Sequence, residues 1–103
     1  MSSKLRLILT WNIRPGREQE YSLFVNDRLA PGLVEIGLPP HDVYYTTYGR
    51  VPQIMVVLEV SDQSHLQQAL SSTQWQTMKR ELLQYIEDYQ ERIVEASDGE
   101  GYF

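Results

Sequence analysis

Residues 53–60, Gln-Ile-Met-Val-Val-Leu-Glu-Val, restrict the fold more than any other segment. They are rich in β-branched residues, which favours a strand, and the middle of that strand is apolar on both faces. A strand with one face in water alternates between apolar and polar residues, and this one does not. We therefore predict that residues 53–60 lie in the centre of a sheet that is covered on both sides.

Two further segments have the pattern of strands. Residues 4–13 alternate, with one face made of Leu5, Leu7, Leu9, Trp11 and Ile13. Residues 41–50 are rich in β-branched and aromatic residues, and residues 49–52 predict a tight turn into the central strand. A four-residue turn would pair Tyr48 with Gln53, Thr46 with Met55 and Tyr44 with Val57. The strand face with Val43, Tyr45 and Thr47 is then expected to pack against helices.

Helical spacing follows the first strand, where the apolar face is formed by Tyr21, Phe24, Val25, Arg28 and Leu29. Pro31 either kinks this helix or opens a short second segment, and Gly37 is a suitable stop. A second helical region starts at Asp62. Within it, residues 73–76 fit a capping box with Thr73 as the N-cap, and the helix that follows is expected to end near Ile86 or Glu87.

Residues 88–96 could prolong that helix or form a fourth strand. A helix from Thr73 to Glu95 would be about 35 Å long, which is too long for a domain of this size. A fourth strand would also pair the free edge of residues 4–13, whose backbone groups otherwise lack partners. We therefore predict that residues 89–95 pair antiparallel with the first strand.

The resulting order is βαββαβ, which predicts an α+β, ferredoxin-like fold with a four-stranded antiparallel sheet. We expect one domain over residues 1–97 and a flexible C-terminal tail over residues 98–103. Helices would cover one face of the sheet. The other face would expose a patch larger than a soluble monomer usually shows, formed by Ile8, Tyr44, Thr46, Tyr48, Met55 and Val57. Pairing two such sheets face to face would bury it.

The strand leading into Ile13-Arg14-Pro15-Gly16, followed by Glu20-Tyr21 in a helix, resembles the opening of dimeric α/β-barrel proteins. That superfamily includes NIPSNAP-like proteins, stress-responsive A/B barrel proteins and cofactor-free antibiotic-biosynthesis monooxygenases. The resemblance is greatest to the NIPSNAP-like branch. It lies in the strand that ends at residues 48–49, the turn through residue 52, and residues 87–89, which lead into the last strand. The resemblance covers roughly residues 4–96. It implies a homodimer whose two sheets form a barrel, and it carries over no catalytic residue.

Composition excludes several function classes. The chain has 9 Lys and Arg against 14 Asp and Glu, a net charge of −5, which argues against nucleic acid and anionic membranes as partners. It has no cysteine, and therefore neither disulfides nor thiolate metal sites. No apolar run approaches the roughly 20 residues of a membrane span, and the N-terminus does not read as a signal peptide, so we expect a cytoplasmic protein.

Few side chains suggest chemistry. His41, beside Asp42 at the start of a strand, suits proton transfer but equally suits a solvated loop; adjacent strand residues point to opposite faces, so Asp42 is not expected to orient it. Two isolated histidines without metal-ligand spacing predict no metal site. The remaining ligand-binding candidates are Asn12, Tyr44, Tyr48 and Arg50, in which the tyrosines serve either as sheet packing or as a ligand wall.

We therefore expect a small-molecule-binding or interaction module of the dimeric α/β-barrel type, with no assigned reaction and no cofactor. The expected partner is a second copy of the chain, and a small-molecule ligand is compatible with the fold. The alternative is a cofactor-independent, monooxygenase-like enzyme for a small aromatic or polyketide-like compound. A pocket containing His41 or Asn12 together with a tyrosine would favour the enzyme, and a third alternative is a purely structural partner-binding protein.

Overall fold

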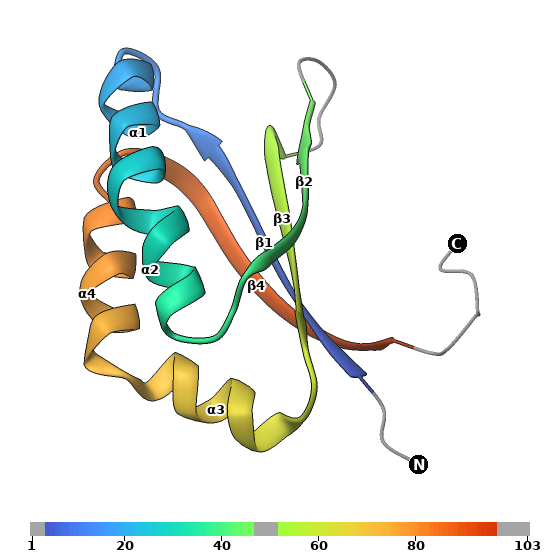
Figure 1. Ribbon diagram of the computed structural model, residues 1–103. Helices are drawn as coiled ribbons and strands as arrows, with labels where there is room; N and C mark the ends of the chain where they lie inside the picture. Colours follow the sequence, from blue (N-terminus) through green and yellow to red (C-terminus); the bar gives the residue numbers. More distant parts are fainter. Residues whose placement is uncertain (1–3, 47–51, 97–103) are drawn as a thin grey trace.

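A computed structural model describes residues 4–46 and 52–96 of the chain (Figure 1). Its elements, in chain order, are β1 (Lys4–Ile13), α1 (Glu18–Phe24), the π-helix η1 (Val25–Leu29), α2 (Ala30–Glu35), β2 (Pro40–Tyr45), β3 (Ile54–Val60), α3 (Gln63–Ser71), α4 (Thr73–Leu82) and β4 (Ile86–Ala96). Within these residues, no helix has the length and apolar character needed to cross a bilayer.

The four strands form one antiparallel sheet in the order β2-β3-β1-β4. The helices cover one face of this sheet (Figure 1), so the predicted ferredoxin-like α+β architecture is confirmed. β3 and β1 occupy the centre, as the apolar pattern of residues 53–60 predicts. We call the face that the helices cover the helical face and the opposite one the open face.

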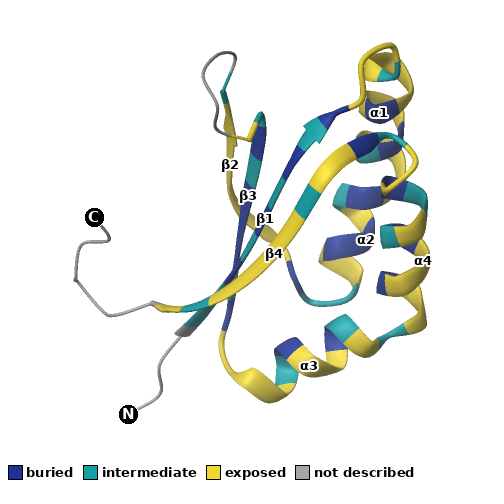
Figure 2. Ribbon diagram, turned by 180° about the vertical axis from the view of Figure 1, so that it is seen from behind, coloured by how far each residue is buried: buried dark blue, intermediate teal, exposed yellow. Residues whose placement is uncertain are grey.

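The hydrophobic core lies between the helical face and the helices (Figure 2). The two central strands contribute alternate residues, because successive strand side chains point to opposite faces. These residues are Leu7, Leu9, Trp11 and Ile13 from β1, and Ile54, Val56, Leu58 and Val60 from β3. The helices complete the core with one apolar stripe each, which includes Tyr21, Phe24, Leu29, Leu33, Leu66, Trp75, Met78 and Leu82.

The helical region before β2 contains a widened turn. α1 continues through the π-helical residues of η1 into α2, whose first turn contains Pro31. A proline is tolerated there because the first-turn N–H groups have no partner within an α-helix. Of the two alternatives for Pro31, the structure therefore has the one in which it opens a second segment. Gly37 ends that segment with φ at +85°, a conformation that suits glycine.

The cap of α4 differs from the prediction. Ser72, not Thr73, is the N-cap: its backbone is extended, and its Oγ accepts a hydrogen bond from the Trp75 backbone N–H at 3.1 Å. The side chain of Gln76 donates to the Leu70 carbonyl at 2.9 Å instead of closing a capping box. The predicted N-cap is therefore one residue too late. The reason is that α3 ends at Ser71 and the chain leaves helical geometry at Ser72, which becomes the cap of α4.

β4 pairs antiparallel with β1, as predicted, but it begins earlier than expected. α4 ends at Leu82, and Ile86 is already the first residue of β4. The pairing shifts between Thr10 and Asn12, and in the same stretch of β4 Asp88 has φ at +58°. Because of this irregularity, Ile86 pairs with Ile13 and lies on the helical face, where it is 1% exposed.

The predicted register of β2 against β3 is wrong by two residues. Tyr44 pairs with Met55, where Val57 was expected, and the Thr46 N–H donates to the Gln53 carbonyl at 2.8 Å. β2 is also shorter than residues 41–50, and residues 47–51 lie outside the described part of the chain. A shift of two leaves every side chain on its predicted face, because strand side chains alternate with a period of two.

Candidate functional site

The helical layer leaves β2 uncovered. Val43 and Tyr45 lie on the helical face beside Val56 and Ile54, yet they are 62% and 63% exposed. All six residues of β2 are exposed, as Figure 2 shows. The face predicted for Val43 and Tyr45 is therefore confirmed, but the expectation that helices bury them is wrong, because the helices pack against β1 and β3.

An apolar pocket lies in the space between β2 and the helices. It has a cavity volume of about 120 Å³ and is partly open to solvent. The sheet supplies its floor, η1 and α2 supply one wall, and Val43 and Pro40 lie at the β2 side. The lining residues are Leu9, Trp11, Tyr21, Val25, Leu29, Ala30, Leu33, Pro40, Val43, Ile54 and Val56. Binding sites for small molecules are usually concave and mostly apolar, as this pocket is.

Tyr21 supplies the one phenol in this lining. Its hydroxyl oxygen accepts a hydrogen bond from the Trp11 Nε1–H at 3.0 Å, and the two rings meet edge to face with centroids 6.5 Å apart. Burial raises the pKa of the Tyr21 phenol, so it is neutral at ordinary pH. Because Trp11 occupies the oxygen as a donor, the hydroxyl hydrogen of Tyr21 can be donated to a further acceptor.

We expect Tyr21→Phe to lower the free energy of unfolding by about 1–3 kcal/mol, the usual cost of leaving a buried donor without its partner. Trp11 is 1% exposed, so water does not replace the lost oxygen. Urea denaturation followed by circular dichroism measures the change. Tyr45→Phe removes a hydroxyl from a 63% exposed side chain and is the matched control. Equal stability of both variants would show that the Trp11–Tyr21 bond does not hold the pocket floor.

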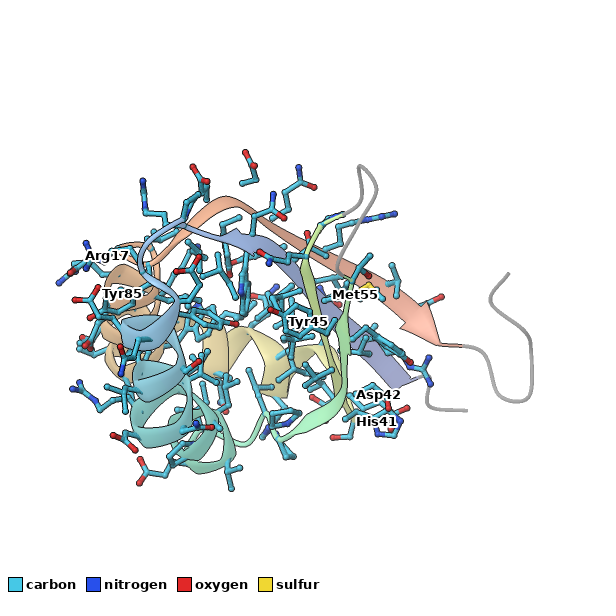
Figure 3. The ribbon with its side chains drawn as sticks, turned by 90° about the horizontal axis from the view of Figure 1, so that it is seen from above. Arg17, His41, Asp42, Tyr45, Met55 and Tyr85 are labelled. Atoms are coloured by element: carbon cyan, nitrogen blue, oxygen red, sulfur yellow. The ribbon has the colours of Figure 1, made fainter. Side chains whose placement is uncertain are left out.

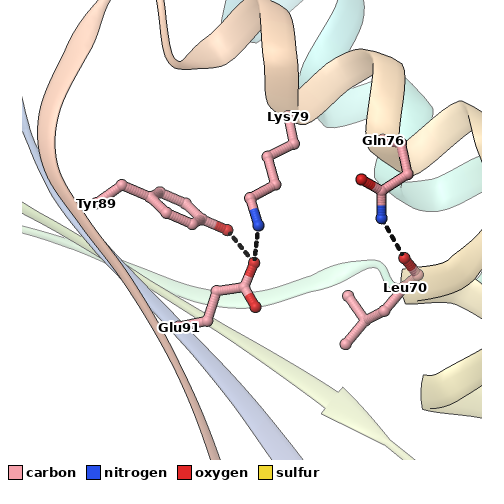
Figure 4. Close-up of polar contacts among 5 residues, drawn as sticks. All are labelled: Leu70, Gln76, Lys79, Tyr89 and Glu91. Carbon is pink, nitrogen blue, oxygen red and sulfur yellow. Dashed lines mark hydrogen bonds and ion pairs between the residues drawn. The ribbon is translucent and has the colours of Figure 1, made fainter.

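A polar cluster of Tyr89, Glu91 and Lys79 (Figure 4) adjoins Trp11. The Tyr89 ring stacks on Trp11 with centroids 6.1 Å apart. Its hydroxyl donates to Glu91 Oε2 at 2.7 Å, and Lys79 Nζ approaches the same oxygen at 2.9 Å. Burial, and then the Glu91 carboxylate, raise the pKa of the Tyr89 phenol. This cluster ties β4 to α4 and fixes the indole that forms the pocket floor.

Asn12 lies away from the pocket and has a structural role. Its side chain donates to Asp88 Oδ2 at 3.1 Å and accepts from the Gln53 backbone N–H at 2.8 Å. The Gln53 side chain in turn accepts from the Ile13 N–H at 2.9 Å. Asn12 thus connects β1 to β4 and to the start of β3, and its amide groups are already used.

His41 and Asp42 lie together, contrary to the expectation that they point to opposite faces (Figure 3). His41 Nε2 is 3.6 Å from Asp42 Oδ2. The pairing of β2 with β3 shifts between Pro40 and Asp42, so His41 is the extra residue of a β-bulge. A bulge breaks the strict alternation of side chains, which lets neighbours meet. Both residues are exposed, and neither lines the apolar pocket.

The other candidates do not converge on one site. Tyr44 lies on the open face with Met55 and Thr10, as the face assignment predicts, and it is 49% exposed. Tyr48 and Arg50 lie outside the described residues. Within residues 4–46 and 52–96 no group of three or more potential metal ligands occurs. The pocket therefore contains a tyrosine, but neither Asn12 nor His41.

Sequence reasoning missed this pocket. Its residues appear in the sequence as ordinary core positions: Trp11 on a strand face, and Tyr21, Val25 and Leu29 on one helix face. The signal that could have been used is the pair Val43 and Tyr45, which share one face of a short edge strand that begins at Pro40. Such a strand has apolar side chains on the helical face, but the helical layer is too narrow to bury them.

No protein-family model matches the chain, and no curated protein matches it in sequence. Solved structures do match it in fold, the ferredoxin-like α+β class. One is a NIPSNAP family protein from Agrobacterium tumefaciens, with TM-score 0.74 and 19% identity over 97% of this chain and 91% of that one. An EthD family protein from Bacillus halodurans has TM-score 0.71 and 18% identity over 91% and 99%.

A third similar structure, from Bacteroides thetaiotaomicron, is a conserved protein of unknown function described as a possible oxidoreductase. It has TM-score 0.69 and 13% identity over 93% of this chain and 100% of that one. Further NIPSNAP family proteins are among the similar structures. The resemblance to NIPSNAP-like proteins noted from the sequence is therefore supported at the level of fold.

Proposed function

We propose that this chain is a homodimeric binding protein for an apolar small molecule, and that the pocket between β2 and the helices is its binding site. The observation that supports this most is the exposure of Val43 at the edge of a pocket lined by core-like side chains. Exposed apolar surface is costly in water, and a ligand that covers it gains roughly 25 cal/mol per Å².

The pocket walls also suggest the chemistry of the ligand. Every lining residue other than Tyr21 is apolar or offers an indole whose N–H is already bonded. Among the lining residues that the structure describes, Tyr21 is the one whose side chain can still donate a hydrogen bond. The wall therefore suits an aromatic or aliphatic compound with one accepting oxygen, such as a carbonyl or an ether.

The open face of the sheet supports the homodimer. Ile8, Tyr44, Met55 and Val57 lie together on it. Tyr44 is 49% exposed and Ile8 and Met55 are half-buried, whereas Val57 is already buried among its neighbours. The helices cover the opposite face, and no described element covers this one (Figure 1). Two copies packed with their open faces together would remove the exposed parts of Ile8, Tyr44 and Met55 from water.

The cofactor-independent, monooxygenase-like alternative has weaker support. Among the described lining residues, Tyr21 is the one group that can ionise, and burial raises its pKa away from the range useful for a general base. Asn12 is engaged in the bonds that connect the strands. Conversion of a bound aromatic compound in air-saturated buffer would favour this alternative over a binding protein.

Binding can be tested with N-phenyl-1-naphthylamine, a neutral apolar dye whose emission rises when it leaves water. We expect the wild-type chain to enhance the emission, and Val43→Trp to weaken the dye's affinity by about tenfold or more, equivalent to 1.4 kcal/mol, because the indole occupies the pocket. Val34→Trp places the same side chain at a 58% exposed position on α2 and should bind the dye like wild type.

The same experiment can reject the pocket. The absence of dye binding by the wild-type chain, or equal affinities of Val43→Trp and Val34→Trp, would contradict the proposal. Thermal unfolding of each variant checks that the fold is intact. Both positions are exposed, so we expect the transitions to lie close to that of the wild type.

A further inference from the structure

The open face carries a row of residues at the same height on all four strands. Ile8 pairs with Val57 on one side and with Arg92 on the other, and Val57 pairs with Asp42. Directly paired residues of neighbouring strands point to the same face. The row therefore reads Arg92, Ile8, Val57 and Asp42 from the β4 edge to the β2 edge.

This row has opposite charges at its two ends. Arg92 is exposed and forms no ion pair with any described residue. Asp42 is 49% exposed in its side chain, and its partner within the chain is His41 at 3.6 Å. Figure 3 shows Asp42 and Met55 on the side of the sheet away from the helices. The two charges lie on opposite edges of the sheet, separated by the strands β1 and β3.

Two copies that pack by their open faces with aligned strands can be related by a two-fold axis in either of two directions. An axis parallel to the strands places β4 over the partner's β2 and keeps each row over itself. Arg92 then faces the partner's Asp42, and Ile8 faces the partner's Val57. An axis perpendicular to the strands, through the middle of the patch, places Arg92 over the partner's Arg92.

We propose that the homodimer uses the parallel axis and is held in register by two symmetric ion pairs between Arg92 and the partner's Asp42. This inference rests on the proposed function, since it specifies how the proposed dimer is arranged. The charges of a neighbouring row are also compatible with the parallel axis. The row of Arg6 and Glu59 is self-complementary, because Arg6, which forms an ion pair with Glu59 of its own chain at 3.0 Å, faces the partner's Glu59. The perpendicular axis instead opposes like charges, which costs affinity.

Charge reversal provides the test. In Arg92→Glu the new carboxylate faces the partner's Asp42, and in Asp42→Arg the new guanidinium faces the partner's Arg92. We expect each variant alone to dimerise at least about tenfold more weakly than wild type in sedimentation equilibrium. Arg80→Glu makes the same charge change on α4, outside the open face, and should leave dimerisation unchanged.

The single variants distinguish the two axes, because a perpendicular axis opposes like charges in the wild type and in each variant, which would then dimerise alike. Mixing the two variants tests whether these charges meet across the interface at all. A heterodimer of Arg92→Glu with Asp42→Arg contains two attractive pairs, whereas each homodimer contains two repulsive ones. Native mass spectrometry separates the three dimers by mass, and we expect the heterodimer to predominate. A mixture without preference for the heterodimer, or variants that dimerise like wild type, would overturn the arrangement while leaving the dimer itself intact. A monomeric wild-type chain would instead reject the proposed dimer.

Discussion

Removal of residues 88–103 is expected to abolish cooperative folding. β1 pairs with β4 from Lys4 to Ile13, so the deletion turns a central strand into an unpaired edge. The backbone N–H and C=O groups of β1 on that side would lose their partners. Trp11 would also lose the Tyr89 ring that stacks on it. Circular dichroism during thermal unfolding should show no sigmoidal transition.

Deletion of residues 98–103 is the matched control for this experiment. It leaves all residues of β4, Ile86–Ala96, in place, and we expect it to be tolerated. A shortened chain that ends at residue 87 and still unfolds cooperatively would contradict the central place of β1 in the sheet. Loss of folding in the shorter deletion would instead show that the tail contributes to the domain.

Met55→Asp is expected to convert the proposed dimer to a monomer. Met55 lies between Thr10 and Tyr44 on the open face, in the middle of the patch that the second copy would cover. A carboxylate enclosed there without a partner is costly, whereas in a monomer it faces water. Sedimentation velocity should shift from twice the chain mass to the single-chain mass of 12.0 kDa.

The control for Met55→Asp is Leu23→Asp, which places the same charge at a 59% exposed position on α1. We expect this variant to remain dimeric. A folded Met55→Asp variant that sediments as a dimer would show that the two copies do not meet through the open face. If Met55→Asp does not fold, Met55→Ser is measured in its place, because it makes the same position polar without adding a charge.

The sequence predicts the topology well because patterns along single elements decide it. The apolar residues of Ile54–Val60 require a central strand, and the alternation of Lys4–Ile13 supplies its neighbour. The assignment of Ile86–Ala96 to a strand rested on topology, since its local propensities are mixed, and it is confirmed. The first two conclusions depend on periodicity, which a single sequence contains in full, and the third follows from them because β1 needs a partner at its second edge.

Details set by turns and bulges could not be predicted in the same way. The register of β2 depends on the connection to β3, and a shift of two residues leaves the faces unchanged, so the hydrophobic pattern does not detect it. The contact between His41 and Asp42 requires the bulge in β2. The pocket depends on where the helices lie relative to β2, which is a property of tertiary packing.

The most direct test of the binding site is methyl NMR of the chain labelled at Ile, Leu and Val, titrated with N-phenyl-1-naphthylamine. We predict shifts for methyl groups that line the pocket, namely those of Leu29, Leu33, Val43, Ile54 and Val56. The methyl groups of Ile8 and Val57, on the open face, should not move. Shifts confined to Ile8 and Val57, with the pocket methyl groups unchanged, would contradict a ligand site between β2 and the helices.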